Sequence, residues 1–217
     1  MSYARVMESV ARAAVRAGRD PDEVTVVAVS KAKTVTDIME VYNLGQRDFG
    51  ENRAQEMMDK VELLPSDIRW HFVGALQSNK ARLVRPLTHL LHSMDRRSLA
   101  SAWLKGRGHA PPVLLQVNVG MEPQKAGVAP DEVMPTLEWM FELGLDVRGL
   151  MAIPPLTDHP EDSRPYFRRM RQLRDQAKAS YPSVEDLSMG MSDDYEVAID
   201  EGASIIRVGR AIFGPRD

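Results

Sequence analysis

The stretch VTVVAVS at residues 24–30 is a nearly uninterrupted apolar run that is rich in β-branched side chains. Such a run is typical of a parallel strand that is covered on both faces. Further short runs of this kind follow along the chain, with stretches of helical spacing between them. The later strands are expected at residues 47–50, 69–74, 89–93, 112–119, 146–153, 186–190 and 204–209.

Strands that alternate with helices require parallel crossover connections, and eight such units are the number that closes a barrel. We therefore predict an α/β protein with a single (β/α)8 barrel of the TIM type. An open, doubly wound sheet is the alternative, but the usual glycine-rich dinucleotide turn does not follow the first strand. An amphipathic first helix should end near Gly18, and the later helices are expected at residues 35–44, 52–64, 76–84, 96–105, 131–143, 162–179 and 194–200.

The composition sets bounds on domain number and partners. A chain of 217 residues with 43% hydrophobic content is expected to form one barrel domain over residues 1–217. Its 28 Lys and Arg against 31 Asp and Glu give a net charge of −3, so no overall field favours nucleic acid or an anionic membrane. The absence of cysteine removes disulfides, thiolate nucleophiles and zinc–thiolate sites from consideration, and we predict no metal site.

The beginning of the chain bears on its location. The first twenty residues contain four arginines, but they lack the apolar stretch of a secretory signal, and an amphipathic helix is the simpler interpretation. No run approaches the roughly twenty apolar residues of a membrane span. We expect a cytoplasmic monomer that binds neither nucleic acid nor membranes.

Lys31 directly follows the first expected strand, with Lys33 two positions on. On structural grounds alone it would be a solvated lysine of a loop. In a barrel of this type, however, the working residues project from the carboxyl ends of the strands. An apolar strand that carries the amine into a mouth of low dielectric constant would favour its neutral form, which can attack an aldehyde. Neighbouring residues must decide between the two interpretations.

Two polar segments follow the last two expected strands: SMGMSDD at residues 188–194 and RVGRAIFG at residues 207–214. The loops after the seventh and eighth strands of this fold commonly form a phosphate cradle from backbone N–H groups and a helix N-terminus. Ser192 can supply a hydroxyl there, and Gly209 an amide that a ligand approaches closely. Helix capping and turns would explain either segment alone, but their joint occurrence favours an anion site.

Arg207 lies inside the apolar run SIIRVG, where an unpaired guanidinium would be costly to bury. It needs a partner, which is either an acidic residue such as Glu51 or a ring nitrogen of a bound heterocycle. His71 and Asn52 are expected at the mouths of the third and second strands, although a single barrel histidine is more often a packed core residue than a catalyst. Met151 is expected to pack in the interior.

Several segments, each at the end of an expected strand, together resemble the pyridoxal phosphate homeostasis protein family, and the resemblance covers nearly the whole chain. That family is similar in fold to the barrel domain of alanine racemase, and it is described as binding the cofactor without an established catalytic activity. The segments are VAVSK, FGENRAQE, WHFVGALQSNK, LLHSMD, VNVGMEPQKAGV, GLMAIPP, LSMGMSDD and RVGRAIFG.

The resemblance implies that Lys31 holds pyridoxal 5'-phosphate (PLP) as a Schiff base. It also implies that Ser192 and the backbone of Gly209 and Arg210 bind the phosphate, and that Arg207 faces the pyridine nitrogen. No catalytic residue is implied. The family often has a proline three residues after the lysine, where this chain has Thr34. Further positions that match pocket motifs of the family are Asn52, His71, Asn79 and Met151.

The resemblance favours a carrier or regulator of PLP, for which PLP-requiring apoenzymes are the candidate partners. A PLP-dependent amino-acid racemase of the alanine racemase type is the alternative. An arginine at the ring nitrogen weakens the ring as an electron sink, and the racemase compensates with a tyrosine from a separate β-rich domain, which we do not expect after Asp217. A barrel aldolase that uses Lys31 directly ranks third, because such aldolases commonly place their lysine on a later strand.

Overall fold

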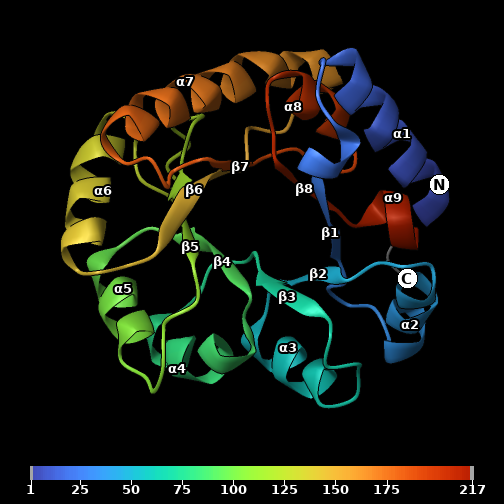
Figure 1. Cartoon of the computed structure of the whole chain (residues 1–217), viewed down its shortest axis with the longest axis horizontal. Coiled ribbons are helices and arrows are strands. Elements are labelled where there is room, and N and C mark those ends of the chain that lie inside the picture. The colour runs from blue at the N-terminus through green and yellow to red at the C-terminus, as the bar shows by residue number, and fades with distance from the viewer. Residues whose placement is uncertain (1, 216–217) are drawn as a thin grey trace.

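The computed structural model describes residues 2–215 and arranges their strands as one closed parallel barrel surrounded by helices (Figure 1). Each strand pairs with the next one in the sequence, and β8 returns to pair with β1. The closure confirms the predicted (β/α)8 barrel and excludes the doubly wound sheet, which has two open edges. The strands are β1 Thr25–Val29, β2 Asp48–Glu51, β3 Arg69–Phe72, β4 Leu90–Met94, β5 Val113–Val117, β6 Val147–Ala152, β7 Asp186–Ser188 and β8 Ile205–Val208.

The helices lie where they were predicted, with small shifts at their ends. The main difference concerns residues 76–84, where only the last four residues are α-helical and Ser78–Lys80 forms a 3-10 turn. Serine and asparagine compete with the helix by bonding to nearby backbone, which explains the late start. A short helix after β8, α9, was not expected. The helices are α1 Tyr3–Arg16, α2 Val35–Asn43, α3 Ala54–Val61, α4 Ala81–Val84, α5 Arg97–Leu104, α6 Val133–Glu142, α7 Arg164–Ser180, α8 Tyr195–Asp200 and α9 Arg210–Phe213.

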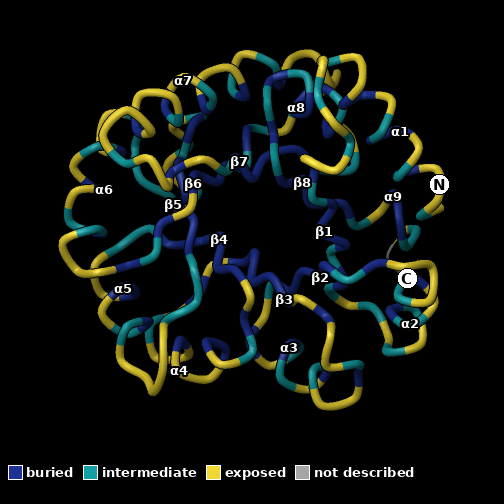
Figure 2. The backbone as a smooth tube through the Cα atoms, in the orientation of Figure 1, coloured by how far each residue is buried: buried dark blue, intermediate teal, exposed yellow. Residues whose placement is uncertain are grey.

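Strand β1 shows why the barrel requires nearly all-apolar runs. Val26 and Ala28 belong to the main core between strands and helices, whereas Val27 belongs to a separate cluster inside the barrel. Successive side chains of a strand point to opposite faces, so a strand in a closed barrel buries both. Figure 2 shows the result: the strands are largely buried, and most exposed residues lie on the outer helices and loops. The interior apolar cluster consists of Val27, Leu90, Leu114, Met151 and Ile205.

The first helix packs on the outside of the barrel beside α8 and α9 (Figure 1). Ser9 donates a hydrogen bond to Glu196 on α8, and Arg16 forms an ion pair with Asp200 at the end of the same helix. Gly18 adopts a φ of +70°, and its amide bonds to the carbonyl of Val15. This is the left-handed conformation with which helices commonly end, so the predicted end near Gly18 is confirmed.

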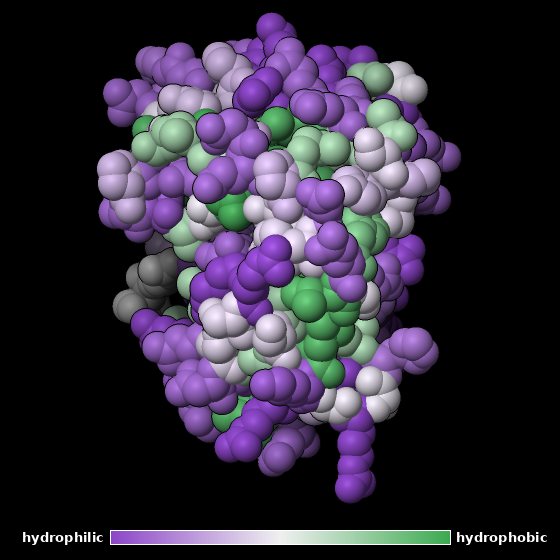
Figure 3. All heavy atoms as spheres, turned by 90° about the vertical axis from the view of Figure 1, so that its left-hand side faces the viewer, coloured by the Kyte–Doolittle hydropathy of each residue, from purple (hydrophilic) through white to green (hydrophobic). Residues whose placement is uncertain are grey.

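The outer surface carries mainly polar side chains. In the view that faces the α6 side of the barrel, hydrophilic side chains surround smaller apolar areas (Figure 3). Among residues 2–215, no helix is both long and apolar enough to cross a membrane.

A buried ion pair connects β2 to α3. The ammonium of Lys60 lies 2.6 Å from Glu51 Oε1 and donates to the carbonyl of Ser30 at 2.8 Å. Glu51 is fully buried, and this burial raises the pKa of its carboxyl despite the nearby ammonium. Removing one partner of such a pair leaves an uncompensated charge in the core.

We therefore expect Lys60→Met to lower the free energy of unfolding by about 3 kcal/mol, measured by urea denaturation at neutral pH. The matched control is Arg12→Met, which breaks the solvent-exposed pair between Arg12 and Glu8 and should cost less than about 0.5 kcal/mol. Equal stability of the two variants would contradict the structural role of the buried pair.

Candidate functional site

A cavity of about 270 Å³ opens at the carboxyl ends of the strands, where barrel enzymes and binding proteins of this fold place their sites. Its walls come from the ends of β1 and β8 and from the loops that follow β2, β3, β6 and β7. The predicted residues Lys31, Asn52, Ser192, Arg207, Gly209 and Arg210 all line it.

Three predicted residues do not line this cavity. His71 lies inside the barrel, because it occupies the third position of β3, and Val73 two residues later takes the place at the mouth. The expectation that His71 lies at the mouth is thus corrected. Met151 is fully buried in the interior apolar cluster, in agreement with its predicted packing role. Asn79 is exposed on the 3-10 turn after β3.

The segment after β1 separates the two neighbouring lysines. Lys31 lines the cavity, whereas the Lys33 ammonium donates to the carbonyl of Pro215 at 3.1 Å. Thr34 begins α2 with a capping box, in which its side chain accepts from the Asp37 amide and the Asp37 carboxylate accepts from the Thr34 amide. Reciprocal capping fixes the start of a helix without a proline. The departure at Thr34 therefore leaves the loop ordered.

The loops after β7 and β8 are tied together on one side of the cavity. Ser192 Oγ accepts from the Ala211 amide at 3.3 Å, and the Arg210 guanidinium forms an ion pair with Asp193. A Cβ added to Gly209 would lie 3.3 Å from the Val29 carbonyl oxygen, which is a tight contact, so the backbone after β8 lies close to the end of β1. A hydroxyl, a guanidinium and the first amides of a helix are groups that bind phosphate oxygens. Asp193 was missed by the sequence analysis, although it directly follows Ser192.

Asn52 provides evidence that the cavity accepts a polar ligand. Its Oδ1 atom is buried and has no hydrogen-bond partner among the described residues. The backbone of Asn52 approaches Gly74 so closely that a Cβ there would lie 2.3 Å from the Asn52 carbonyl oxygen. The β2–α3 loop is thus held in a fixed position beside β3. A buried amide without a partner calls for an explanation, and a bound group that donates a hydrogen bond supplies one.

Arg207 extends from β8 to the floor of the cavity and is 5% exposed. Its guanidinium donates to Ser188 Oγ at 2.5 Å and to the Ala152 carbonyl at 2.9 Å, and it forms no ion pair with any residue that the structure describes. The alternative of a salt bridge to Glu51 is wrong, because Glu51 binds Lys60. Burial lowers the pKa of Arg207 to about 10, and only the more distant charge of Asp194 opposes this shift.

A continuous row of hydrogen bonds runs from Arg207 through the barrel interior. Ser188 Oγ lies 2.8 Å from His92 Nδ1, and His92 Nε2 lies 2.9 Å from His71 Nδ1. The row ends at the opposite face of the barrel, where His71 Nε2 lies 3.0 Å from the carboxylate of Asp48. We call Ser188, His92, His71 and Asp48 the interior chain. Of its four residues, only His71 was predicted from the sequence as a site residue.

The Asp48 end of the interior chain predicts a pH effect. Burial alone would raise the pKa of Asp48, but hydrogen bonds and charges from His71 and Arg69 lower it to about 2. A carboxyl whose pKa is lower in the folded than in the unfolded protein stabilises the fold above the unfolded pKa of about 3.9. This contribution is lost as the pH falls toward the folded value.

Wild type should therefore be more stable than Asp48→Asn at about pH 5, and the gap should shrink by about 1 kcal/mol between pH 5 and pH 3. Urea denaturation of both proteins at the two pH values measures the gap, and the other carboxyls, which the two proteins share, cancel in the comparison. A gap that stays constant would show that Asp48 does not carry the lowered pKa.

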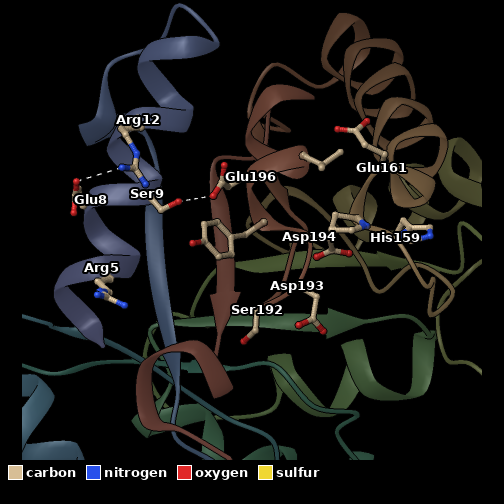
Figure 4. Close-up of a pocket in the computed structure, with 13 residues that line it drawn as sticks. Arg5, Glu8, Ser9, Arg12, His159, Glu161, Ser192, Asp193, Asp194 and Glu196 are labelled. Atoms are coloured by element: carbon tan, nitrogen blue, oxygen red, sulfur yellow. Dashed lines mark hydrogen bonds and ion pairs between the residues drawn. The ribbon is translucent and has the colours of Figure 1, made fainter. Parts of the chain in front are cut away.

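A larger cavity of about 740 Å³ lies beside the first one and is shown in Figure 4. It is bounded by α1, by the loop before α7 and by the segment that leads into α8, and it shares Ser192 and Asp193 with the candidate site. Several of its polar and charged groups already interact with each other, including the pairs Glu8–Arg12 and Ser9–Glu196 in Figure 4. Its described lining residues include no lysine at a strand end, so its size alone does not make it the candidate site.

Comparison with known proteins shows what the chain resembles. A family model described as the alanine racemase N-terminal domain matches residues 4–217. A protein of Aquifex aeolicus named pyridoxal phosphate homeostasis protein is 44% identical over 218 residues, which cover 98% of this chain and 96% of the relative.

Two solved structures extend the comparison to three dimensions. The crystal structure of an unknown protein from Bifidobacterium adolescentis has a TM-score of 0.90 and 33% identity, and the match covers 96% of this chain and 92% of that one. The structure of PipY from Synechococcus elongatus with PLP bound has a TM-score of 0.81 and 36% identity, with coverage of 96% and 100%.

Proposed function

The chain belongs to the alanine racemase N-terminal domain family and, within it, to the pyridoxal phosphate homeostasis proteins, and from this membership we propose that it binds PLP in the strand-end cavity and serves to control the availability of that cofactor. One observation carries the proposal. A strand-end lysine, a set of phosphate-binding groups and a buried guanidinium with no carboxylate partner among residues 2–215 line one cavity. Each of these groups suits one part of PLP.

Lys31 would hold PLP as a Schiff base, in which the lysine amine condenses with the aldehyde carbon and the aldehyde oxygen leaves as water. Ser192 and the backbone of Gly209 and Arg210 hold the phosphate, since their loops lie on one side of the cavity. Arg207 faces the ring nitrogen, because its remaining N–H groups need an acceptor. Asn52 directs its unpaired Oδ1 to a donor of the ligand.

A carrier role suits the cavity better than racemisation. Bound PLP supplies an electron-withdrawing ring, and the permanently charged Arg207 discourages protonation of the ring nitrogen, which makes that ring a weaker electron sink. Racemisation also needs two acid/base groups on opposite faces of the ligand. Among the described lining residues there is no histidine or tyrosine, and the Asp193 carboxylate is already paired with Arg210.

Transfer of PLP to apoenzymes that require it is the partner relationship that we propose. A second hollow lies next to the cavity, and the two share Ile153, Leu156, Met191, Ser192 and Asp193 in their walls. Bound PLP would lie in a cavity that opens at the carboxyl ends of the strands. Control of a cofactor requires such access in both directions.

Borohydride reduction tests the covalent attachment. Wild type incubated with PLP should become yellow, and reduction should fix a mass adduct that peptide mapping places on Lys31, because only this lysine of the β1–α2 segment lines the cavity. Lys31→Ala should lose the adduct. The control is Lys33→Ala, which should keep it, since Lys33 is directed to Pro215.

A colourless wild type that stays unmodified in excess PLP would contradict the proposal as a whole. An adduct that persists in Lys31→Ala and disappears in Lys33→Ala would instead move the attachment to Lys33.

Equilibrium dialysis of PLP tests the phosphate end. Ser192→Ala should weaken PLP binding about tenfold to a hundredfold without unfolding the protein, because it removes one hydrogen bond to a charged group. The control Ser78→Ala changes a serine on the β3–α4 turn outside the cavity and should leave the affinity unchanged. If both variants bind PLP like wild type, Ser192 serves only to hold the Ala211 amide.

A further inference from the structure

The interior chain has an order of donors and acceptors that one end determines. The carboxylate of Asp48 can only accept, so His71 must present Nε2–H to it. With one proton on each ring, His71 then accepts at Nδ1, which requires Nε2–H on His92. Complete burial is the main cause that lowers the pKa of His92 well below its usual value, so His92 is neutral and accepts at Nδ1.

This order determines what Ser188 offers to Arg207. The Ser188 hydroxyl must donate its only proton to His92 Nδ1, so its oxygen lone pairs remain for the Arg207 guanidinium. Every link then has one donor and one acceptor, and neither imidazole needs an extra proton. The reverse order would bring the N–H groups of His92 and Arg207 to the same oxygen and would leave the hydroxyl proton without this acceptor.

The interior chain is protected from competing water. His92 and Ser188 are completely buried, and His71 is 2% exposed. The apolar side chains of the interior cluster lie in the same barrel interior and are themselves buried. Hydrogen bonds in such a dry interior are stronger than in water, and a break in a buried polar network is costly. The direction set by Asp48 is therefore maintained along the whole row.

We propose that the interior chain positions Arg207 for the ligand. Asp48 at the far face of the barrel fixes the orientation of the Ser188 hydroxyl. Ser188 in turn holds the Arg207 guanidinium in the orientation that donates a hydrogen bond to a heteroaromatic ring nitrogen. Asp48, His71, His92 and Ser188 are positioning residues that do not touch the ligand. This inference rests on the proposed function, because it assigns the ring end of the PLP site to a carboxylate on the opposite side of the molecule.

The inference distinguishes the two ends of the ligand. Arg207 is anchored by Ser188 and Ala152, whereas the Ser192 hydroxyl and the amides after β8 are outside the interior chain. A substitution of Asp48 should thus weaken the hydrogen bond to the ring nitrogen and leave the binding of the phosphate group unchanged. If Asp48 had only a structural role, its substitution would weaken the binding of the ring and of the phosphate group equally.

The tautomers of the histidine rings test the proposed order of donors and acceptors in the interior chain without any cofactor. Long-range ¹H–¹⁵N correlation spectra of the apoprotein at neutral pH should show both His71 and His92 as neutral rings with the proton on Nε2. In Asp48→Asn the amide can donate to His71, so the Nδ1–H form should appear on both rings. An Nδ1–H proton on His92 in wild type, or an unchanged pattern in Asp48→Asn, would overturn the proposed order.

The affinities of PLP and of inorganic phosphate test the consequence. Asp48→Asn and Ser188→Ala should each bind PLP about tenfold more weakly than wild type, because a hydrogen bond to a charged group is lost or misdirected, while inorganic phosphate binds as before. Asp67→Asn is the matched control. It removes another carboxylate that pairs with an arginine, Arg47, but that does not belong to the interior chain, and it should leave both affinities unchanged.

The results separate the two proposals. Loss of PLP and phosphate affinity in equal measure, or equal PLP affinity in Asp48→Asn and Asp67→Asn, overturns the positioning role. A wild-type protein that binds no PLP overturns the proposed function instead. The tautomers of the apoprotein then still decide whether Asp48 sets the order of donors and acceptors in the interior chain.

Discussion

The guanidinium of Arg207 lies in the closed interior of the barrel with no carboxylate partner in the described part of the chain, and the arrangement of the site depends on this uncompensated cation. A buried charge without an ion pair must be stabilised by hydrogen bonds. Two acceptors, Ser188 Oγ and the Ala152 carbonyl, hold it from the side of the barrel. We propose that, on the side that faces the cavity, a neutral ring nitrogen of a ligand accepts a hydrogen bond from Arg207 without cancelling the charge.

Closure of the barrel brings the other groups to this cation. Lys31, Asn52 and Ser192 are far apart in the sequence, but each follows a strand, and all parallel strands of a barrel end on the same face. The opposite face contributes as well, because the interior chain reaches from Arg207 to Asp48. The two faces of this barrel are therefore coupled by hydrogen bonds.

The strands and most of the site could be predicted from the sequence for a simple physical reason. A strand covered on both faces must be apolar along its length, and residues that follow such strands gather at one end of the barrel. The sequence alone therefore predicts that Lys31, Ser192 and Gly209 lie close together, and all three line the strand-end cavity. Their roles toward PLP belong to the proposed function.

Other features depend on properties that a single sequence does not display. Whether His71 reaches the mouth or the interior depends on the stagger between neighbouring strands. The partner of Glu51 depends on how α3 packs on β2, so Lys60 was not recognised. The link between His92 and Ser188 joins residues 96 positions apart, and no local pattern indicates such a contact.

A crystal structure of the protein soaked or grown with PLP tests the central claim most directly. The account predicts continuous electron density from Lys31 Nζ to the ligand, the phosphate between Ser192 and the Gly209–Arg210 backbone, and a guanidinium nitrogen of Arg207 within about 3 Å of the ring nitrogen. PLP bound in the larger cavity beside α1, or with its ring nitrogen turned away from Arg207, would contradict the account.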